Sequence, residues 1–270
     1  MAVGFDGNCV AGAPLDELRA FAPGAIVLFG RNVASSDALR ELVAALRAVD
    51  TLPPLIAVDQ EGGRVARIGE GVAQLPSAMA VGAAGDVDAC ERLGILLGRD
   101  LAQLGISVDF APVADCALNA ENTVIGTRAY ARDPLAVGRF AGAFARGLEA
   151  GGVAAALKHF PGHGSTAVDS HLALPHVRID EATFRSRDLL PFAAAISGEA
   201  AQIVMAAHVV VDALDAQHPA SLSPRILTGL LRDELGFDGV IVTDCLEMAA
   251  IAATAKPFWP VATAAFTKKP

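Results

Sequence analysis

Short apolar or β-branched segments alternate along this chain with longer segments of helical periodicity. The apolar segments are short enough to be buried strands, and most end in polar or glycine residues. They lie at residues 2–3, 25–29, 55–58, 106–110, 153–157, 203–207 and 240–243. Strands that alternate with helices run parallel and are joined by right-handed crossovers. The pattern therefore restricts the fold to a doubly wound sheet or a (β/α)8 barrel.

The segments between these strands support helices, and the positions of the polar motifs favour the barrel. Helices are expected at residues 36–49, 87–104, 134–148, 189–196 and 224–235. No Gly-x-Gly-x-x-Gly sequence follows the first strand, as a dinucleotide-binding doubly wound sheet would require. Polar motifs instead follow several strands, as at the carboxyl-terminal face of a barrel. The sequence predicts an α/β TIM-type barrel over residues 1–251, in one domain.

The C-terminal segment, residues 252–270, differs from the rest of the chain. It contains three of the four lysines, the only tryptophan and three prolines, which exclude a long regular helix. Seven strands can be recognised before it, and no eighth. We therefore expect an incomplete barrel with an atypical tail, as a truncation or frameshift after about Ile251 would produce. The first strand and the strand before Asp244 would then be unpaired edges, which predicts low solubility or weak activity.

Composition excludes several classes of function. The chain has 270 residues, of which 53% are hydrophobic and 19% charged, with a net charge of -9. No basic surface for nucleic acid and no apolar run long enough to span a membrane is expected. The four cysteines form no Cys-x-x-Cys pair and the N-terminus lacks a signal sequence, which favours a cytoplasmic protein with reduced thiols. A monomer without metal or other cofactor is expected.

A lysine and several histidines follow the strand at residues 153–157. The sequence there is Lys158-His159-Phe160-Pro161-Gly162-His163-Gly164, with Asp169 and His171 shortly after. These histidines could belong to an ordinary solvated turn. However, the other three lysines all lie in the C-terminal segment, and arginine supplies the positive charge elsewhere. An isolated ammonium group at a strand end favours a functional Lys158–His159 pair.

Three further clusters follow other strands. Asp59 leaves one strand and precedes Gly62, Gly63 and Arg67; Asp115 and Arg128 follow another; Asp244 leaves a third. A carboxylate at the end of a rigid strand is a candidate nucleophile or base. Each cluster also has a structural interpretation. The Asp59 cluster could be a capped βα turn with solvated charges, and Asp115 could be a structural cap. Asp244 could be the N-cap of the next helix, and Arg128 could be a surface residue. Cys245 is expected to be a small buried side chain.

Together these clusters resemble glycoside hydrolase family 3, specifically its bacterial β-N-acetylglucosaminidases of peptidoglycan recycling. The resemblance runs from the first strand to about Ile251. It is carried by Asp59-Gln60-Glu61-Gly62-Gly63-Arg64-Val65, by Lys158-His159-Phe160-Pro161-Gly162-His163-Gly164 with Asp169-Ser170-His171, and by Val242-Thr243-Asp244-Cys245-Leu246-Glu247-Met248.

The resemblance implies a role for each matching residue. Asp244 would attack the anomeric carbon and form a covalent glycosyl-enzyme, and His171, paired with Asp169, would be the general acid and base. The substrate would be a terminal N-acetylglucosamine of a muropeptide fragment. Its expected ligands are Asp59, Arg67, Arg128, Lys158 and His159. A retaining mechanism usually needs two carboxylates about 5 Å apart, and a histidine near its ordinary pKa could replace one of them.

Two alternatives remain open at this stage. The first is a metal-dependent barrel hydrolase with His159, His163, Asp169 and His171 as ligands, since imidazole and carboxylate bind zinc. It explains neither Lys158 nor Asp244. The second is a catalytically impaired sugar-binding remnant of the family. The sequence also leaves open whether water or phosphate resolves the glycosyl-enzyme, because a neutral histidine base would not repel phosphate.

Overall fold

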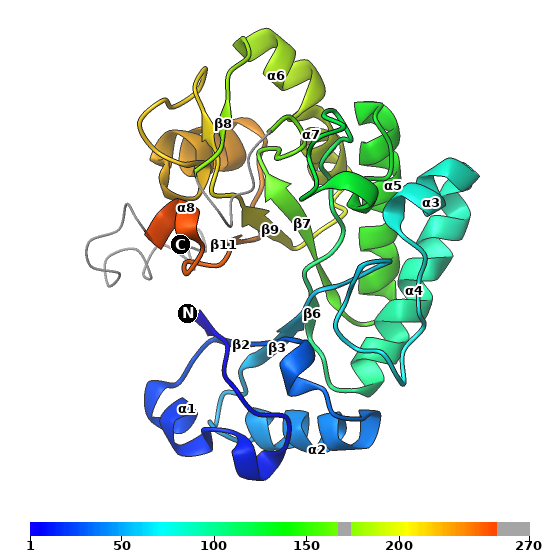
Figure 1. The fold of residues 1–270 in the computed structure, drawn as a ribbon, viewed down its shortest axis with the longest axis vertical. Helices are drawn as coiled ribbons and strands as arrows, with labels where there is room; N and C mark the ends of the chain where they lie inside the picture. The colour runs from blue at the N-terminus through cyan, green and yellow to red at the C-terminus, as the bar shows by residue number, and fades with distance from the viewer. Residues whose placement is uncertain (167–173, 253–270) are drawn as a thin grey trace.

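The computed structural model describes residues 1–166 and 174–252, so Asp169, His171 and residues 253–270 of the expected tail lie outside the described residues. One curved sheet forms its centre (Figure 1). The seven strands follow the order β1-β2-β3-β6-β7-β9-β11, and every neighbouring pair is parallel. They span Ala2–Val3, Ala25–Leu28, Leu55–Val58, Val108–Asp109, Ala154–Phe160, Ile203–Ala206 and Val240–Thr243.

The prediction of an incomplete barrel is confirmed for the part of the chain that the structure describes. The sheet curls so that its edge strands, β1 and β11, lie on the same side of the molecule in Figure 1. Within the described ranges these two strands do not pair with each other. The boundary predicted at residue 251 falls inside α8 (Ala249–Ala252), directly before the undescribed segment.

The helices form at the predicted segments and cover the outer face of the sheet. The long ones are α2 (Ser36–Arg47), α4 (Val87–Gln103), α5 (Pro134–Ala150), α7 (Leu190–Ser197) and the π-type helix η5 (Arg225–Glu234). The Ser35 hydroxyl accepts a hydrogen bond from the amide of Ala38 and caps α2. Shorter helices are α1 (Leu15–Phe21), α3 (Ala78–Ala84) and α6 (Glu181–Arg187), with 3-10 turns η1 (Val10–Gly12), η2 (Gly30–Asn32), η3 (Gly126–Arg128) and η4 (Ala220–Leu222). No helix among the described residues is both long and apolar enough to cross a membrane.

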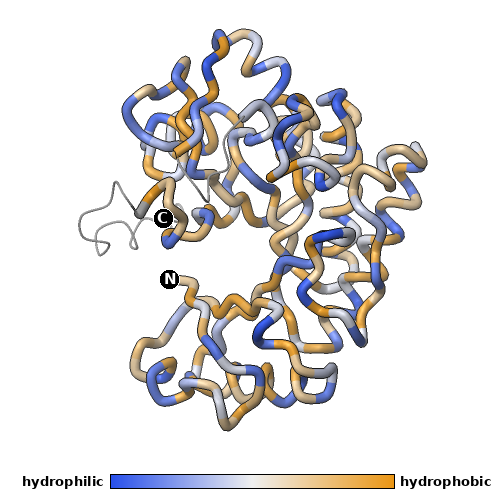
Figure 2. Tube along the Cα trace, in the orientation of Figure 1, coloured by the Kyte–Doolittle hydropathy of each residue, from blue (hydrophilic) through white to orange (hydrophobic). Residues whose placement is uncertain are grey.

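Side chains of the large sheet alternate between its two faces up to Lys158 in β7, where the register shifts. The strands are largely hydrophobic in Figure 2. Outward side chains such as Ile56, Leu157 and Ile241 pack in the main core. Inward side chains form a second, smaller cluster of mostly small and medium residues, which includes Ala57, Ala156 and Val242. Because alternate residues of a strand share a face, the next inward positions are Asp59, Lys158 and Asp244. The fold therefore directs these three side chains toward the inside of the curved sheet, at the mouth formed by the carboxyl-terminal ends of its strands.

Two short strand pairs lie outside the large sheet and were not predicted. The first is an antiparallel pair of β4 (Gln60–Gly62) and β5 (Val65–Ala66), and the second a parallel pair of β8 (His176–Val177) and β10 (Val210–Val211). Such short ladders leave no periodic pattern in the sequence. The chain turns tightly between β4 and β5 at the paired glycines: Gly62 has a φ of 92°, and a Cβ there would lie 2.7 Å from the carbonyl oxygen of Pro76.

Candidate active site

A buried lysine holds two carboxylates together at the mouth of the sheet. The Lys158 Nζ atom lies 2.7 Å from Asp59 Oδ1 and 2.6 Å from Glu61 Oε1. The Lys158 side chain is 2% exposed. Burial alone would lower the pKa of Lys158, but Asp59 and Glu61 outweigh it and raise that pKa above its ordinary value. Lys158 is therefore an ammonium ion fixed between two carboxylates.

Glu61 connects this lysine to Arg128. Arg128 donates from Nε to Glu61 Oε2 at 2.8 Å and from Nη2 to Oε1 at 2.6 Å. Burial opposes the charge on Glu61, but Lys158 and Arg128 prevail and lower its pKa to about 2. Bidentate pairs of this kind fix geometry as well as charge. The surface position allowed for Arg128 is therefore wrong, because the structure places this residue in the charged cluster.

Arg67 is the least constrained cation of the site. Its Nη2 atom lies 4.0 Å from Asp59 Oδ2, and 35% of its side chain is exposed. Among the described residues, its buried Nε atom has no hydrogen-bond partner. The backbone amide of Arg67, by contrast, donates to Gln60 Oε1 at 2.7 Å. A fixed backbone with a side chain free to donate suits a group that completes its hydrogen bonds on a ligand.

A network centred on Asp115 holds the loop that follows β7. His159 Nδ1 lies 2.7 Å from Asp115 Oδ2, and the amides of His159 and His163 both donate to the same carboxylate. Burial opposes ionisation of Asp115, but His159 in particular keeps its pKa low. Arg128 Nη2 lies 3.2 Å from His159 Nε2 and can only donate. The structural role considered for Asp115 is thus confirmed, and this aspartate orients His159.

Asp244 directly follows β11, and its carboxylate makes no ion pair within the residues that the structure describes. Its backbone amide donates to the carbonyl of Ala206 at 2.9 Å, which continues the pairing of β11 with β9. Its Oδ1 atom accepts from the amide of Cys245 at 2.7 Å. Burial opposes ionisation of Asp244, but His159, the Cys245 amide and Lys158 keep its pKa below the ordinary value. Asp244 does not cap α8, which begins at Ala249. The expectation of a buried Cys245 is wrong, since this residue is exposed in the turn.

Asp109 is a buried carboxyl group whose pKa is raised, unlike those of Glu61, Asp115 and Asp244. Asp109, at the end of β6, is fully buried; Oδ1 accepts from the Gln60 amide at 2.9 Å, and Oδ2 has no partner among the described residues. Burial raises its pKa to about 8, with Asp59 and Glu61 adding to the effect of burial. Asp109 is therefore mostly a neutral acid at pH 7. Its hydrogen-bond donor is the backbone amide of Gln60, the residue between Asp59 and Glu61.

We expect the unfolding free energy of Asp109→Asn, taken relative to that of the parent, to increase as the pH rises. An unfolded aspartate ionises near pH 3.9, whereas folded Asp109 keeps its proton up to about pH 8. Between these values the folded state binds more protons, so the parent loses stability with a slope of at most about 1.4 kcal/mol per pH unit. Asparagine has no such proton. Urea unfolding at pH 5, 7 and 9 measures the difference, with exposed Asp233→Asn as control. If the unfolding free energies of Asp109→Asn and the parent changed equally with pH, the neutral state of Asp109 would be contradicted.

The structure brings together most of the predicted site. Asp59, Lys158, His159 and Arg128 form one connected cluster, with Arg67 at its edge. The catalytic roles predicted for Asp169 and His171 stay predictions. Sequence reasoning missed Glu61, Asp109 and His208. A signal existed for Glu61, because it lies two residues beyond Asp59 in an extended segment and so shares its side.

The metal-dependent alternative finds no support in the described ranges. No group of three or more His, Cys, Asp or Glu side chains with metal-site geometry occurs among residues 1–166 and 174–252. Two of the proposed ligands, Asp169 and His171, lie outside these ranges. His159 is unsuitable as a ligand, because Asp115 occupies its Nδ1 atom and the Arg128 cation faces its Nε2 atom.

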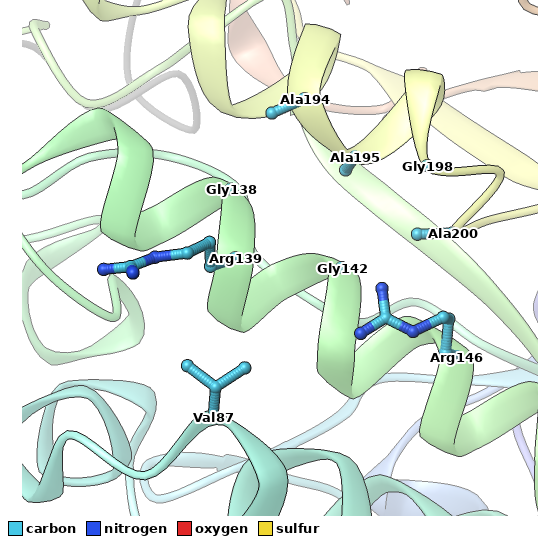
Figure 3. Close-up of a pocket in the computed structure, with 9 residues that line it drawn as sticks. All are labelled: Val87, Gly138, Arg139, Gly142, Arg146, Ala194, Ala195, Gly198 and Ala200. Atoms are coloured by element: carbon cyan, nitrogen blue, oxygen red, sulfur yellow. The ribbon is translucent and has the colours of Figure 1, made fainter.

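Two surface hollows lie outside the charged cluster. One, of about 230 Å³, lies between α5 and the end of α7, where small residues such as Gly138, Gly142 and Ala194 face each other beside Arg139 and Arg146 (Figure 3). The other, of about 250 Å³, is lined by the loop after β6, including Asn119, Asn122 and Arg132. Neither is lined by Asp59, Lys158 or Asp244. The strand ends, and not these hollows, carry the reactive groups.

Comparison with known proteins agrees with this geometry. The model of the glycosyl hydrolase family 3 N-terminal domain matches residues 16–265. A beta-hexosaminidase of Stenotrophomonas maltophilia is 41% identical over 256 residues, which cover 92% of this chain and 75% of that protein. A family 3 beta-N-acetylglucosaminidase from a Paenibacillus strain superposes with a TM-score of 0.90 at 41% identity, covering 94% of this chain and 49% of that one.

A second solved structure adds a ligand. It is NagZ from Neisseria gonorrhoeae in complex with N-trifluoroacetyl-D-glucosamine, with a TM-score of 0.84 and 36% identity over 92% of this chain and 74% of that one. The family model and these relatives match nearly the whole sequence. In this chain, the charged cluster lies at the carboxyl-terminal ends of the strands. The chain belongs to glycoside hydrolase family 3 and is a glycosidase.

Proposed function

We propose that this protein removes terminal β-linked N-acetylglucosamine from the non-reducing end of its substrate, with retention of configuration. The observation that carries the proposal is the convergence of three inward strand positions, Asp59, Lys158 and Asp244, at one mouth. Two of them belong to a cluster of charged hydrogen-bonding groups, and the third is a carboxylate with no ion-pair partner among the described residues. A sugar gripped by the first two would present its anomeric carbon to the third.

The charged cluster has free hydrogen-bonding capacity for a sugar. Lys158 uses two of its N–H groups on Asp59 and Glu61 and keeps another for a ligand. Asp59 is 19% exposed, and its Oδ2 atom can accept from sugar hydroxyl groups. Arg67 can donate from its Nε atom. Arg128, in contrast, spends most of its donors on Glu61, His159 and the carbonyl of Val124 and mainly supports the others.

The state of Asp244 suits nucleophilic attack. Its pKa lies below the ordinary value, so the carboxylate is ionised at neutral pH. The Cys245 amide holds Oδ1, whereas Oδ2 has no hydrogen-bond partner among the described residues. Oδ2 is therefore the atom that we assign to the attack. It forms a bond to the anomeric carbon as the bond from that carbon to the leaving oxygen breaks, which gives a glycosyl-enzyme.

We assign the proton transfers to His171, oriented by Asp169. This imidazole would protonate the leaving oxygen in the first step and deprotonate water in the second. The acyl glucosamine bound by the Neisseria relative supports an N-acetylated sugar. We propose that the natural substrates are muropeptide fragments and that the protein works in the cytoplasm, where such fragments are recycled.

A pair of chromogenic substrates tests the proposed reaction. The full chain is incubated with 4-nitrophenyl N-acetyl-β-glucosaminide and, separately, with the matching β-glucoside. Release of 4-nitrophenol from the first and little from the second would support the proposal. Equal turnover of both would contradict the acetamido preference. Binding of N-acetylglucosamine without any turnover would favour the sugar-binding remnant.

We expect the loss caused by His171→Ala to depend on the leaving group. General acid catalysis typically contributes 10²- to 10⁴-fold, but a leaving group that departs without a proton does not need it. The variant should therefore lose roughly 100-fold or more in the first step with an alkyl N-acetylglucosaminide and far less with the 2,4-dinitrophenyl substrate. Substrate consumption in single-turnover experiments measures that step. His176→Ala is the control. An equal loss on both substrates would contradict the role of His171 as acid.

A further inference from the structure

A second histidine lies directly behind the Asp244 turn. His208 follows β9 in a loop, and its side chain is completely buried. Its Nε2 atom lies 2.9 Å from the carbonyl oxygen of Cys245, and its Nδ1 atom lies 2.6 Å from the hydroxyl of Ser221, which belongs to η4. His208 therefore connects η4 to the residue that follows the proposed nucleophile.

These contacts determine which nitrogen of His208 carries the proton. A carbonyl oxygen can only accept, so Nε2 must donate to Cys245. The neutral ring then has a lone pair on Nδ1, which accepts from the Ser221 hydroxyl. Burial lowers the pKa of His208, even though Asp244 acts in the opposite direction, and this keeps the ring neutral. Asp244 is the charged side chain that acts on this ring.

The backbone of Cys245 is consequently held at both of its polar groups. Its amide donates to Asp244 Oδ1 at 2.7 Å, and its carbonyl accepts from His208. The amide of Met248 also donates to this carbonyl, at 3.2 Å, which closes the turn without connecting it to the rest of the sheet. His208 supplies the side-chain contact that anchors the turn to the neighbouring strand and to η4. The two groups belong to adjacent peptide units joined at the Cys245 Cα, so loss of the His208 contact would let φ and ψ of Cys245 change. That change would move the hydrogen bond on Oδ1 and redirect Oδ2.

We propose that His208 is a positioning residue that sets the direction of the Asp244 carboxylate through the carbonyl of Cys245. This role rests on the proposed function, in which Asp244 Oδ2 attacks the sugar. The neutral Nε2–H form of the ring makes the connection, and Ser221 selects that form. Because His208 acts behind the carboxylate and not on the sugar, it contributes to the rate of attack and little to substrate binding. A misplacement of a reacting group by about 1 Å can cost on the order of 100-fold in rate.

Three variants of the full chain test this role. His208→Leu removes the donor with a side chain of comparable bulk, His208→Gln keeps an N–H near the Nε2 position, and Ser221→Ala removes only the hydroxyl that selects the tautomer. With 2,4-dinitrophenyl N-acetyl-β-glucosaminide, we expect His208→Leu to lower kcat by about 10- to 100-fold with KM within about threefold of the parent. His208→Gln should recover kcat to within about fivefold of the parent, and Ser221→Ala should lie between Gln and Leu.

Covalent labelling separates this proposal from the proposed function. A fluorinated N-acetylglucosaminide with a good leaving group traps the glycosyl-enzyme, and mass spectrometry locates it. Labelling of Asp244 that is slowed in His208→Leu and recovered in His208→Gln would support the positioning role. Labelling of Asp244 with parent-like kcat in His208→Leu, or equal losses in Leu and Gln, would overturn it. A parent that is never labelled at Asp244 would overturn the proposed nucleophile and, with it, this role. If His208→Leu fails to fold, Ser221→Ala decides. A kcat and a labelling rate below those of His208→Gln would support the role, and parent-like values of both would overturn it.

Discussion

Asp244→Asn is expected to lower kcat for an N-acetyl-β-glucosaminide by roughly 10⁴-fold or more while leaving the fold intact. The substitution removes the negative charge that attacks the anomeric carbon and stabilises the positive charge that develops there. The asparagine side chain retains a carbonyl oxygen that can accept from the Cys245 amide, as Asp244 Oδ1 does at 2.7 Å. The turn after β11 should therefore be preserved, and the loss should appear in the chemical step.

The measurement is a comparison of kcat, KM and the thermal unfolding midpoint in parent and variant. Because the carboxylate acts mainly in the transition state, KM should change much less than kcat. Asp238→Asn, an exposed substitution shortly before the same strand, is the control and should leave kcat unchanged. A kcat within tenfold of the parent, measured on protein with an unchanged unfolding midpoint, would exclude Asp244 as nucleophile.

The sheet could be predicted because its strands carry a strong sequence signal. Buried parallel strands read as short apolar runs, and the run at residues 55–58 coincides with β3 (Leu55–Val58). The 3-residue strand β4 could not be predicted, because its position depends on contacts of Gly62 and Gly63 with residues 75–77. Short ladders of this kind are fixed by tertiary contacts that no local pattern records.

The site could be predicted where it depends on strand ends and could not where it depends on burial. Asp59, Lys158 and Asp244 all continue the inward row of an apolar strand, so the alternation of the strand indicates where they point. The sequence does not reveal that Asp109 is neutral, because its protonation depends on complete burial beside other carboxylates. His208 was likewise missed. Its function is set by the distant carbonyl of Cys245 and not by its neighbours in the chain.

Glu61 is the residue whose importance is least visible in the sequence, and Glu61→Gln should have a large effect on stability. Its carboxylate is 6% exposed and balances Arg128, 12% exposed, and Lys158, 2% exposed. Breaking a buried ion pair on one side typically costs about 3–5 kcal/mol, because the remaining charge is left without compensation. The glutamine retains one acceptor oxygen but no charge. We therefore expect a loss of about 3 kcal/mol in the free energy of unfolding at pH 7.

The pH dependence of this loss identifies its electrostatic origin. Folding lowers the pKa of Glu61 from 4.5 to about 2, so the stabilisation is fully present above the unfolded value and is lost as the pH falls through the folded value. The difference in unfolding free energy between parent and Glu61→Gln should accordingly shrink between about pH 5 and pH 2. Urea titrations at pH 7, 5, 4 and 3 measure it.

A matched control distinguishes the effect of losing a buried ion pair from the effect of losing an exposed one. Glu91 pairs with Arg146 at 3.0 Å on the surface, where the two side chains are 39% and 46% exposed. Exposed pairs contribute about 0–1 kcal/mol, so Glu91→Gln should change stability by no more than that. Glu61→Gln should also raise KM for the N-acetylglucosaminide about tenfold or more, since Lys158 and Arg128 would lose the group that fixes them. Equal stability losses for the two variants, or a Glu61→Gln loss that does not change with pH, would show that Glu61 does not organise the site by its charge.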